Sequence, residues 1–397
     1  MNLLRIEPRA PLPRGQARLV DARALRAALE RETTAEIRFD AVSRALYSTD
    51  ASVYRIEPLG VVLPRTQEDL VAIVRLCARL ACPLTMRGGG TSQSGQTIGD
   101  GLIVDTSKHL NRLLELNVGE RWARVEPGIV LDELNATLRP HGLRFAPDVS
   151  TASRATLGGM MANNSSGARS VLYGKTIDHV LEQGVVLADG SLAHFGPIAD
   201  AEAAARGEQG TREGDCYRVV RGLARDLRDE IDRRYPKVLR RVGGYNLDEF
   251  VDAARPFNLA KLLVGSEGTL AVVLNAKVHL VPLPRAKAVL AIQFHDLLES
   301  LSATPVILRH GPSAVEVMDK SILDYTRQSA ALEAIRRGFI EGDPGALLCV
   351  EFYGDESEDL PPRMQAVEAD LRARGYGYHF HHATDLAAQA RIWSLRE

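Results

Sequence analysis

The 397-residue sequence lacks an excess of charge of either sign and lacks any long hydrophobic run. It holds 49 Lys and Arg against 51 Asp and Glu, so no overall charge favours binding to nucleic acid or anionic lipid. No apolar segment approaches a membrane span, and charges interrupt the N-terminal MNLLRIEPRAPLPRGQ, unlike a signal peptide. These absences predict a cytoplasmic protein without a nucleic-acid partner, and they leave open a peripheral contact at the inner face of the membrane.

Cysteine is also scarce. Cys77, Cys82, Cys216 and Cys349 are scattered and have no C-x-x-C spacing of the kind that binds zinc or an iron-sulfur cluster. We therefore expect reduced thiols. With 45% hydrophobic residues, the chain is long enough for two or three domains whose cores need no disulfide or metal.

Two familiar phosphate-binding motifs are missing. A Rossmann loop requires G-x-G-x-x-G leading directly into a helix, whereas the glycine run in RGGGTSQSGQ, residues 87–96, continues into polar residues and then a strand. A P-loop requires a glycine five positions before Gly174-Lys175-Thr176, and that position is Arg169. Neither of these nucleotide-binding folds is supported.

Short strands and helices follow one another from about Ile56. After an arm and a helix at 24–32, the pattern predicts a strand in PLGVVLPRT and a helix that begins at the N-cap Thr66 and ends near Leu80. LTMR and GLIVDTS read as strands joined by the glycine loop. This mixture favours an α+β fold over a long βαβα series.

Later segments continue the alternation. We expect a strand at 122–126, a helix at 130–138, a strand pair around an Asp189-Gly190 turn, a charged helical insertion at about 198–256, and a return to strand at 259–284. A second set of strands and helices begins near residue 285. The predicted division is therefore an N-terminal arm and helix (1–55), a first domain (56–284) and the first part of an α+β second domain (285–397).

The C-terminal segment LAAQARIWSLRE is helical in pattern but has no Gly or Asn cap. Its apolar face, formed by Ile392, Trp393 and Leu395, is expected to need a partner. We therefore expect the chain to be the front part of something longer.

Two stretches contain unusually little side-chain bulk. Three consecutive glycines lose much conformational entropy on ordering, so the loop at 87–96 is costly unless its backbone approaches something closely or adopts positive φ. Consecutive amides can form an anion-binding nest, and Thr91, Ser92 and Gln96 add neutral donors. A phosphate or diphosphate suits this loop, and a plain surface loop is the alternative.

The order of four motifs is more specific than either stretch. RGGGTSQSGQ, VEPG, APDVSTASRATLGGMMANNSSGARSVLYGKTIDHV and LVGSEGTLAVV occur in that order with short strands between them. The sequence here resembles the flavin-binding domain of the vanillyl-alcohol oxidase and p-cresol methylhydroxylase superfamily, and within it the FAD-dependent D-2-hydroxy acid dehydrogenases that act on glycolate, D-lactate or D-2-hydroxyglutarate. The resemblance covers about Pro58 to Pro284 and extends more weakly to the end.

This resemblance implies a two-subdomain FAD-binding domain of the p-cresol methylhydroxylase type, followed by an α+β substrate (cap) domain. It implies that the first loop wraps the diphosphate, that the second glycine stretch passes beside the ribityl chain and the flavin ring, and that a third turn closes near the adenosine half. The implied cofactor-binding residues are Arg87, Gly88, Gly89, Gly90, Thr91, Ser92, Gly95, Gln96, Pro147, Thr156, Gly158, Gly159, Asn163, Ser166, Gly167, Tyr173, Gly174, Gly265, Glu267 and Gly268.

One departure from the family pattern concerns how the cofactor is held. Covalent members of the superfamily usually carry a histidine in or just after the first glycine run, where this sequence has Thr91 and Ser92. The resemblance therefore implies noncovalent FAD.

The substrate side is less complete. IWSLRE resembles a motif whose arginine contacts the substrate, which makes Arg396 the candidate for the carboxylate, with an ordinary exposed helix residue as the alternative. The family's catalytic histidines, often around a divalent metal, come from segments beyond residue 397, so we assign no base and no metal ligand. The HFHH run, residues 379–382, reads as an edge strand, and His109, His141, His179 and His279 read as structural.

The resemblance predicts a dehydrogenase that oxidises a small 2-hydroxy acid and passes electrons to an unidentified acceptor. That acceptor is an iron-sulfur domain or subunit, a quinone or an electron-transfer protein. An FAD-dependent reductase of the cell-wall precursor type is one alternative, disfavoured by the SEGTL turn and the terminal LRE. A non-catalytic FAD-binding module is the other.

Overall fold

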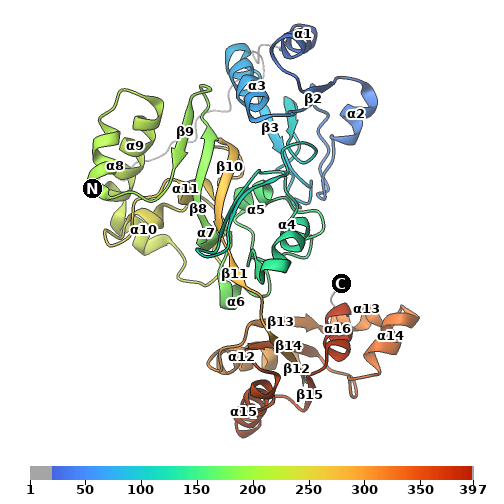
Figure 1. Cartoon of the computed structure of the whole chain (residues 1–397). Helices are drawn as coiled ribbons and strands as arrows, with labels where there is room; N and C mark the ends of the chain where they lie inside the picture. Colours follow the sequence, from blue (N-terminus) through green and yellow to red (C-terminus); the bar gives the residue numbers. More distant parts are fainter. Residues whose placement is uncertain (1–19, 396–397) are drawn as a thin grey trace.

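The computed structural model describes residues 20–395, and residues 1–19 and 396–397 lie outside this description. Among the described residues, the strands form a four-stranded, a five-stranded, a two-stranded and a second four-stranded sheet. The first three sheets and their helices make one part of the molecule, and the last sheet makes a second part joined to it after β11 (Figure 1).

The first sheet has the strand order β1-β2-β4-β3. β2 and β3 both run parallel to β4, and α3 makes the crossover between β2 and β3. The predicted N-cap is confirmed, since Thr66 accepts from the Asp69 N–H at 3.1 Å. Helices α1 and α3 bury their apolar stripes against this sheet. The elements are β1 (Glu36–Arg38), β2 (Gly60–Leu63), β3 (Leu84–Arg87), β4 (Leu102–Asp105), α1 (Ala22–Glu32), α2 (Ala41–Leu46) and α3 (Gln67–Leu80).

The second sheet is antiparallel, with the order β5-β6-β10-β8-β9. Gly190 has φ 82° in the turn between β8 and β9, so the predicted Asp189-Gly190 turn is confirmed. Side chains of β8 and β10 also enter the core of the first sheet, which joins the two subdomains. The strands are β5 (Leu113–Asn117), β6 (Trp122–Val125), β8 (Val180–Val186), β9 (Leu192–Phe195) and β10 (Val272–His279).

Short helices and a small sheet complete this part. The residues of α4, α5, α7 and α11 share one core with the second sheet. These elements are α4 (Leu131–Leu138), α5 (Leu157–Asn163), α6 (Ser170–Tyr173), α7 (Thr176–His179), α11 (Ala260–Leu263), the 3-10 turns Arg139–His141 and Leu247–Phe250, and the paired strands β7 (Leu143–Arg144) and β11 (Val281–Pro282).

The charged insertion is helical as predicted. It contains α8 (Asp200–Gly207), α9 (Arg212–Asp226) and α10 (Arg228–Arg234). The expectation of strand from residue 259 is wrong at its start, because α11 occupies Ala260–Leu263. Asn258 Oδ1 accepts from the Ala260 N–H at 3.0 Å, and both Ala260 and Leu263 are buried in the core, which favours one helical turn before β10.

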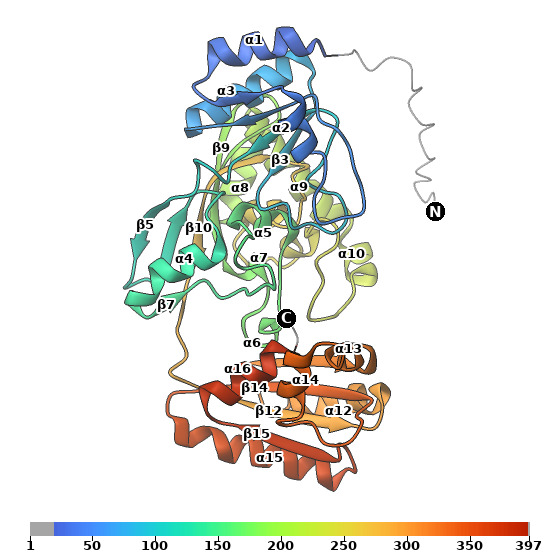
Figure 2. The same cartoon turned by 90° about the vertical axis from the view of Figure 1, so that its right-hand side faces the viewer.

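The fourth sheet, ordered β13-β14-β12-β15, forms the second part of the molecule. Alternate residues of β12 point to opposite faces: Leu290 and Ile292 meet α12 and α15, while Val289 and Ala291 meet α13 and α16. In Figure 2 the α16 side faces the first part and α15 lies on the far side. The elements are β12 (Ala286–Phe294), β13 (Ala314–Asp319), β14 (Ala346–Gly354), β15 (His379–Ala383), α12 (Leu297–Leu308), α13 (Lys320–Thr326), α14 (Ala330–Arg336), the 3-10 turn Ser357–Asp359, α15 (Leu360–Ala373) and α16 (Leu386–Ser394).

The structure tests two expectations for this part, the edge strand HFHH and the apolar face of the C-terminal helix. The HFHH edge strand is confirmed as β15, which lies at the end of the sheet. The expectation that the apolar face of the C-terminal helix needs a partner is met within this chain, since Ile392 and Leu395 are buried against residues of β12 and β14. The α+β class and the two-subdomain arrangement are confirmed, while the exact boundaries 1–55, 56–284 and 285–397 stay predictions. Within residues 20–395, no helix combines the length and the apolar character needed to span a bilayer.

Candidate functional site

The first glycine run forms a loop that leaves β3 and packs directly on a second loop. A Cβ added to Gly89 would lie 2.2 Å from the Arg154 carbonyl oxygen, and one added to Gly88 would lie 2.2 Å from Thr156 Oγ1. Gly90 has φ 65°, a conformation that L side chains rarely adopt. The backbone of the loop can therefore approach residues 154–156 only because these positions lack side chains.

The second glycine stretch builds the opposite wall around α5. Thr156 is the N-cap of this helix, and its side chain accepts from the Gly159 N–H at 3.3 Å. After the helix, a Cβ added to Gly167 would lie 2.0 Å from the Asp148 carbonyl oxygen. Residues 148–151 and 165–168 are thereby held side by side.

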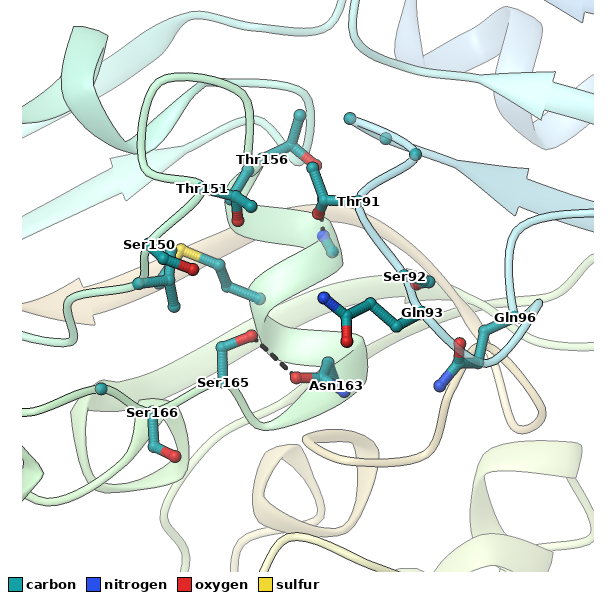
Figure 3. Close-up of a pocket in the computed structure, with 18 of the residues that line it drawn as sticks. Thr91, Ser92, Gln93, Gln96, Ser150, Thr151, Thr156, Asn163, Ser165 and Ser166 are labelled. Atoms are coloured by element: carbon teal, nitrogen blue, oxygen red, sulfur yellow. Dashed lines mark hydrogen bonds between the residues drawn. The ribbon is translucent and has the colours of Figure 1, made fainter. Parts of the chain in front are cut away.

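A cavity of about 500 Å³ lies between these walls, within the size range of small-molecule and cofactor sites. Figure 3 shows hydroxyl and amide side chains pointing into it from both loops and from α5, with Ser165 Oγ bonded to Asn163 Oδ1 at 3.0 Å. Most of the lining consists of glycines and small polar residues: Gly88, Gly89, Gly90, Thr91, Ser92, Gln93, Ser94, Gln96, Thr97, Val149, Ser150, Thr151, Ala155, Thr156, Gly159, Met160, Asn163, Ser165, Ser166, Gly167, Ala168, Arg240 and Glu316.

Two charged residues complete the lining, and both come from distant segments. Arg240 lies between α10 and the 3-10 turn at 247–250, and its Nε donates to Ser166 Oγ at 3.1 Å. Glu316 lies on β13, in the second part of the molecule. Among the described residues that line the cavity, Arg240 is the single cationic side chain. The cavity is therefore bounded by both parts of the chain.

The predicted site residues divide into two groups. One group lines the cavity, namely Gly88, Gly89, Gly90, Thr91, Ser92, Gln96, Thr156, Gly159, Asn163, Ser166 and Gly167. The other group lies outside the lining, namely Arg87, Gly95, Pro147, Gly158, Tyr173, Gly174, Gly265, Glu267 and Gly268. Arg396 lies outside the described residues.

Arg87 faces away from the cavity. Its Nη1 donates to the Thr49 carbonyl at 2.9 Å, and its guanidinium lies 5.5 Å from the centre of the Tyr47 ring. A Cβ added to Gly90 would meet this guanidinium at 2.5 Å, so Arg87 lies directly behind the loop. Arg87 thus ties the glycine loop to the segment after α2.

The predicted third turn supports α5 from behind. The Gly265 N–H donates to the Met161 carbonyl at 2.8 Å, and Glu267 Oε1 accepts from Asn163 Nδ2 at 3.2 Å. Burial raises the pKa of Glu267. The turn therefore contacts a cavity residue, Asn163, without lining the cavity itself.

A bidentate ion pair fastens the two parts of the chain together beside the cavity. Arg169, two residues after Gly167, donates from Nε and Nη2 to the two carboxylate oxygens of Glu351 at 2.8 and 2.9 Å. Its Nη1 also donates to Asp148 Oδ2 at 2.9 Å. Glu351 on β14 is 2% exposed and also accepts from Ser313 Oγ, so this carboxylate is buried and well satisfied.

Aromatic rings beside this ion pair add further contacts between the two parts of the chain. Tyr173 and Tyr353 lie 6.3 Å apart between ring centres, and Arg144 stacks 5.3 Å from the centre of the Tyr173 ring. Burial raises the pKa of Tyr353. Tyr173, one of the implied cofactor-binding residues, therefore contacts the second part of the chain.

Sequence reasoning missed several lining residues for different reasons. Most of those between 93 and 168 lie inside the two glycine-containing stretches and were missed only as individual residues, and Thr97 directly follows the first stretch. Arg240 and Glu316 belong to segments read as a surface insertion and as part of another domain. The Gly243-Gly244 pair just after Arg240 was a signal for a loop there, and no sequence signal marked Glu316.

The histidines do not gather into a site. His109 contacts Glu36 at 2.7 Å in a charged cluster. His179 is buried, bonds the Tyr173 carbonyl at 2.7 Å and stacks on His279. Burial lowers the pKa of both stacked histidines. Within the described part of the chain, no group of three or more His, Cys, Asp or Glu residues could hold a metal ion.

Comparison with known proteins identifies the family. A family model described as an FAD binding domain matches residues 58–196, and one described as the C-terminal domain of FAD linked oxidases matches residues 283–397. The chain belongs to the FAD-linked oxidase family. The two matched segments correspond to the two parts of the fold, and the cavity lies where they meet.

Curated relatives and solved structures agree with this assignment. A D-2-hydroxyglutarate dehydrogenase of Pseudomonas putida is 34% identical, covering 91% of this chain and 37% of the relative, and one of Pantoea ananatis is 36% identical, covering 89% and 36%. Glycolate oxidase subunit GlcD of Bacillus subtilis is 29% identical, covering 82% and 60%. The structure of an alkyldihydroxyacetonephosphate synthase has a TM-score of 0.61 at 18% identity, covering 91% of this chain and 62% of that chain, which shows the shared fold. The chain thus spans little more than a third of the length of the D-2-hydroxyglutarate dehydrogenases that it matches.

The size and the polar lining of the cavity fit a dinucleotide. Four of the lining glycines occupy positions where a side chain would narrow or displace a wall. Gln96 Oε1 is buried in the loop and has no hydrogen-bond partner within residues 20–395, so an acceptor faces the site unsatisfied. The lining of the cavity within the matched FAD binding domain and beyond it thus combines glycines, hydroxyl and amide side chains and one guanidinium.

Proposed function

We propose that the protein is an FAD-dependent dehydrogenase that oxidises a D-2-hydroxy acid to the corresponding 2-oxo acid. The observation that carries the proposal is a single cavity lined by both glycine loops and by β13 of the C-terminal domain. A cofactor in that cavity would be reachable from a substrate held by the second domain. The names of the relatives, D-2-hydroxyglutarate dehydrogenase, D-lactate dehydrogenase and glycolate oxidase subunit, supply the substrate class.

The residues that would hold the cofactor follow from the lining. The amides of Gly88–Gly90 with the hydroxyls of Thr91 and Ser92 would bind the diphosphate, as freed backbone donors bind anions. Thr156, Asn163 and Ser166 would contact the ribityl chain and the ring. No histidine lines the described cavity, which supports noncovalent binding. Bound FAD would supply an acceptor for the hydride from the hydroxylated carbon.

Arg240 supplies the positive charge that the glycine loop itself lacks. Arg87 is engaged behind the loop, whereas Arg240 reaches the cavity edge and bonds only a neutral hydroxyl there, Ser166 Oγ, in the described structure. A guanidinium in this position would stabilise an anionic group of the cofactor or its reduced form. Arg87 remains a proposed diphosphate neighbour through the loop that it positions.

The substrate carboxylate needs a cation of its own. Arg396 is the proposed partner, because a guanidinium matches a carboxylate bidentately and the sequence around it resembles the family motif. No base is assigned within residues 20–395. The remaining predicted residues, Gly95, Pro147, Gly158, Tyr173, Gly174, Gly265, Glu267 and Gly268, are proposed as supports of the cavity walls.

The partner that receives the electrons is proposed as an iron-sulfur domain or subunit, a quinone or an electron-transfer protein. The proposed location is the cytoplasm, including its membrane face, and the composition and scattered cysteines support this. A divalent metal is proposed only in connection with sequence beyond residue 397.

Anaerobic mixing with substrates tests the proposed activity. Purified FAD-loaded protein is mixed separately with D-2-hydroxyglutarate, D-lactate, glycolate and the L-isomers, and the flavin absorbance near its visible maximum is followed. Bleaching by a D-acid without NADPH is expected. Bleaching by NADPH alone would favour the cell-wall reductase reading, and persistent yellow colour with every acid would favour the binding module.

A further inference from the structure

The turn that ends α3 brings two cysteines together. The Cys82 N–H donates to the Cys77 carbonyl at 2.9 Å, and the Ala81 N–H donates to the Ala78 carbonyl at 3.3 Å. Ala81 itself is left-handed, with φ 50°. These bonds define a Schellman motif, in which the side chains at the positions of Cys77 and Cys82 commonly pack on each other. Here the contact that is usually apolar is made by two thiols.

The two thiols differ in character. They hydrogen-bond each other, and this bond from Cys77 is the main reason why the pKa of the Cys82 thiol is lowered. The same bond and burial raise the pKa of the Cys77 thiol. The Cys82 thiol also donates to the Pro83 carbonyl oxygen at 3.4 Å, and Cys82 is the more exposed residue of the pair. Its greater exposure and the lowered pKa favour Cys82 as the attacking thiol, since the thiolate is the reactive form.

The pair can be reached by a small molecule. Cys77 and Cys82 are 2% and 6% exposed, yet both line an open groove of about 400 Å³ between the end of α3, the start of β3 and residues 268–272. Cys216 and Cys349 have no second cysteine in such a turn. Within the described residues none of the four cysteines is in a disulfide.

We propose that Cys77 and Cys82 form an oxidisable dithiol that hydrogen peroxide converts into an intramolecular disulfide. The Cys82 thiolate attacks the peroxide, an S–O bond forms, the O–O bond breaks, and hydroxide leaves. The Cys77 sulfur then attacks Cys82, the S–S bond forms, the S–O bond breaks, and water leaves with the Cys77 proton. Two thiols and one peroxide give one disulfide and two waters. This site is independent of the proposed substrate chemistry.

The site lies one strand before the first glycine loop. Cys82 is followed by Pro83, whose carbonyl accepts from the Leu102 N–H at 2.8 Å, and then by β3 and the loop. A disulfide would fix the end of α3 to the start of β3 at the covalent S–S distance. Oxidation would thus act on the same segment that positions Gly88.

Trypsin provides a direct test, because Arg79 lies between the two cysteines. Protein treated with hydrogen peroxide is denatured, alkylated and digested without reductant. The expected product is the peptide LCAR joined to LACPLTMR, with two hydrogens fewer than the separate peptides, and it should split on reduction. Alkylated, separate LCAR and LACPLTMR from peroxide-treated protein in which Cys216 is oxidised would overturn the proposal.

Single variants assign the two roles. In Cys77→Ser, Cys82 should be trapped by dimedone as a sulfenic acid, whereas in Cys82→Ser the remaining Cys77 should stay unlabelled. Cys216→Ser serves as the matched control and should form the linked peptide as the unchanged protein does. Equal dimedone labelling of Cys77 and Cys82 in the two variants, at unchanged melting temperature, would contradict the assigned order of attack and overturn the mechanism.

Discussion

Replacing Gly89 with alanine should weaken FAD binding without unfolding the protein. Gly89 has no positive φ, so alanine can adopt its backbone conformation and the effect is steric. The new Cβ would lie 2.2 Å from the Arg154 carbonyl oxygen, whereas ordinary contact begins at 3.4 Å. The glycine loop must therefore move by more than 1 Å, and the obstacle is backbone, which cannot rotate away.

The size of the effect follows from overpacking. Forcing extra atoms into a packed contact costs about 1–3 kcal/mol, and each 1.4 kcal/mol changes a dissociation constant tenfold. If the glycine loop moves to accommodate the new methyl group, this free energy is lost from FAD binding, and FAD affinity should fall by about 5- to 150-fold. Titration of the apoprotein with FAD, followed by flavin fluorescence, measures this change, and thermal unfolding of the apoprotein measures the effect on the fold.

Gly222→Ala is the matched control. A Cβ at Gly222 on α9 meets nothing within 4 Å, so this alanine should leave FAD affinity unchanged and stabilise the helix by about 0.5–1 kcal/mol. Wild-type FAD affinity in Gly89→Ala would refute the reasoning, since the contact between residues 89 and 154 would then have no part in shaping the cofactor site.

Three further outcomes are expected. Arg240→Gln should weaken FAD binding about tenfold, because a hydrogen bond to a charged group contributes about 1.5–3 kcal/mol. Arg228→Gln removes the same charge on α10 and should leave FAD binding unchanged. Equal losses of FAD affinity in the two variants would contradict a local role of Arg240. Glu351→Gln should lower the free energy of unfolding by about 3 kcal/mol in urea, because it removes the charge that pairs with Arg169 across the two parts, and an unchanged midpoint would exclude this fastening. Burial lowers the folded-state pKa of His179 below 6.5, so the stability of the fold should be full above pH 6.5 and should decrease as the pH falls below that value. His179→Phe should reduce the loss of melting temperature between pH 7.5 and 5. An equal loss of melting temperature in the variant and the unchanged protein would contradict this role of His179.

Local signals in the sequence predicted the elements that carry the site. Thr66 and Pro83 marked the two ends of α3, and the Asp189-Gly190 pair marked the hairpin, because capping and turn chemistry act over a few residues. The predicted return to strand at residue 259 is wrong at its start because Asn258 Oδ1 accepts from the Ala260 N–H where a single helical turn begins, and the apolar residues of that turn are buried like those of a strand. A short apolar run alone does not distinguish these two structures.

Long-range relations could not be read in the same way. The apolar face of α16 was predicted to need a partner, but the sequence did not show that Ile392 packs against β12 and β14 of the same chain. Arg240 and Glu316 reach the cavity from an insertion and from a different sheet, and their neighbours in sequence carry no trace of this. Periodicity shows that a face is buried but does not show what covers it.

The structure shows a different role for the glycines from the one that the sequence suggested. The sequence suggested that their lack of side chains lets the backbone approach the cofactor. In the structure, added Cβ atoms at Gly88, Gly89, Gly158 and Gly167 would collide with Thr156, Arg154, Pro127 and Asp148, which are other parts of the protein. These glycines therefore first allow two loops and a helix to pack closely on neighbouring parts of the protein, and the cavity is the space that this packing leaves.

This distinction changes what a substitution at each glycine reports. Gly158 lies outside the cavity lining and meets the Pro127 carbonyl, so alanine there should move α5 as a unit and change FAD affinity through the helix. Gly159, on the cavity side, meets Thr156 Oγ1 at 3.3 Å and is otherwise open, so alanine there should act on the cofactor directly. Adjacent glycines of one motif thus have separable roles: Gly158→Ala should lower both apoprotein stability and FAD affinity, whereas Gly159→Ala should lower affinity alone.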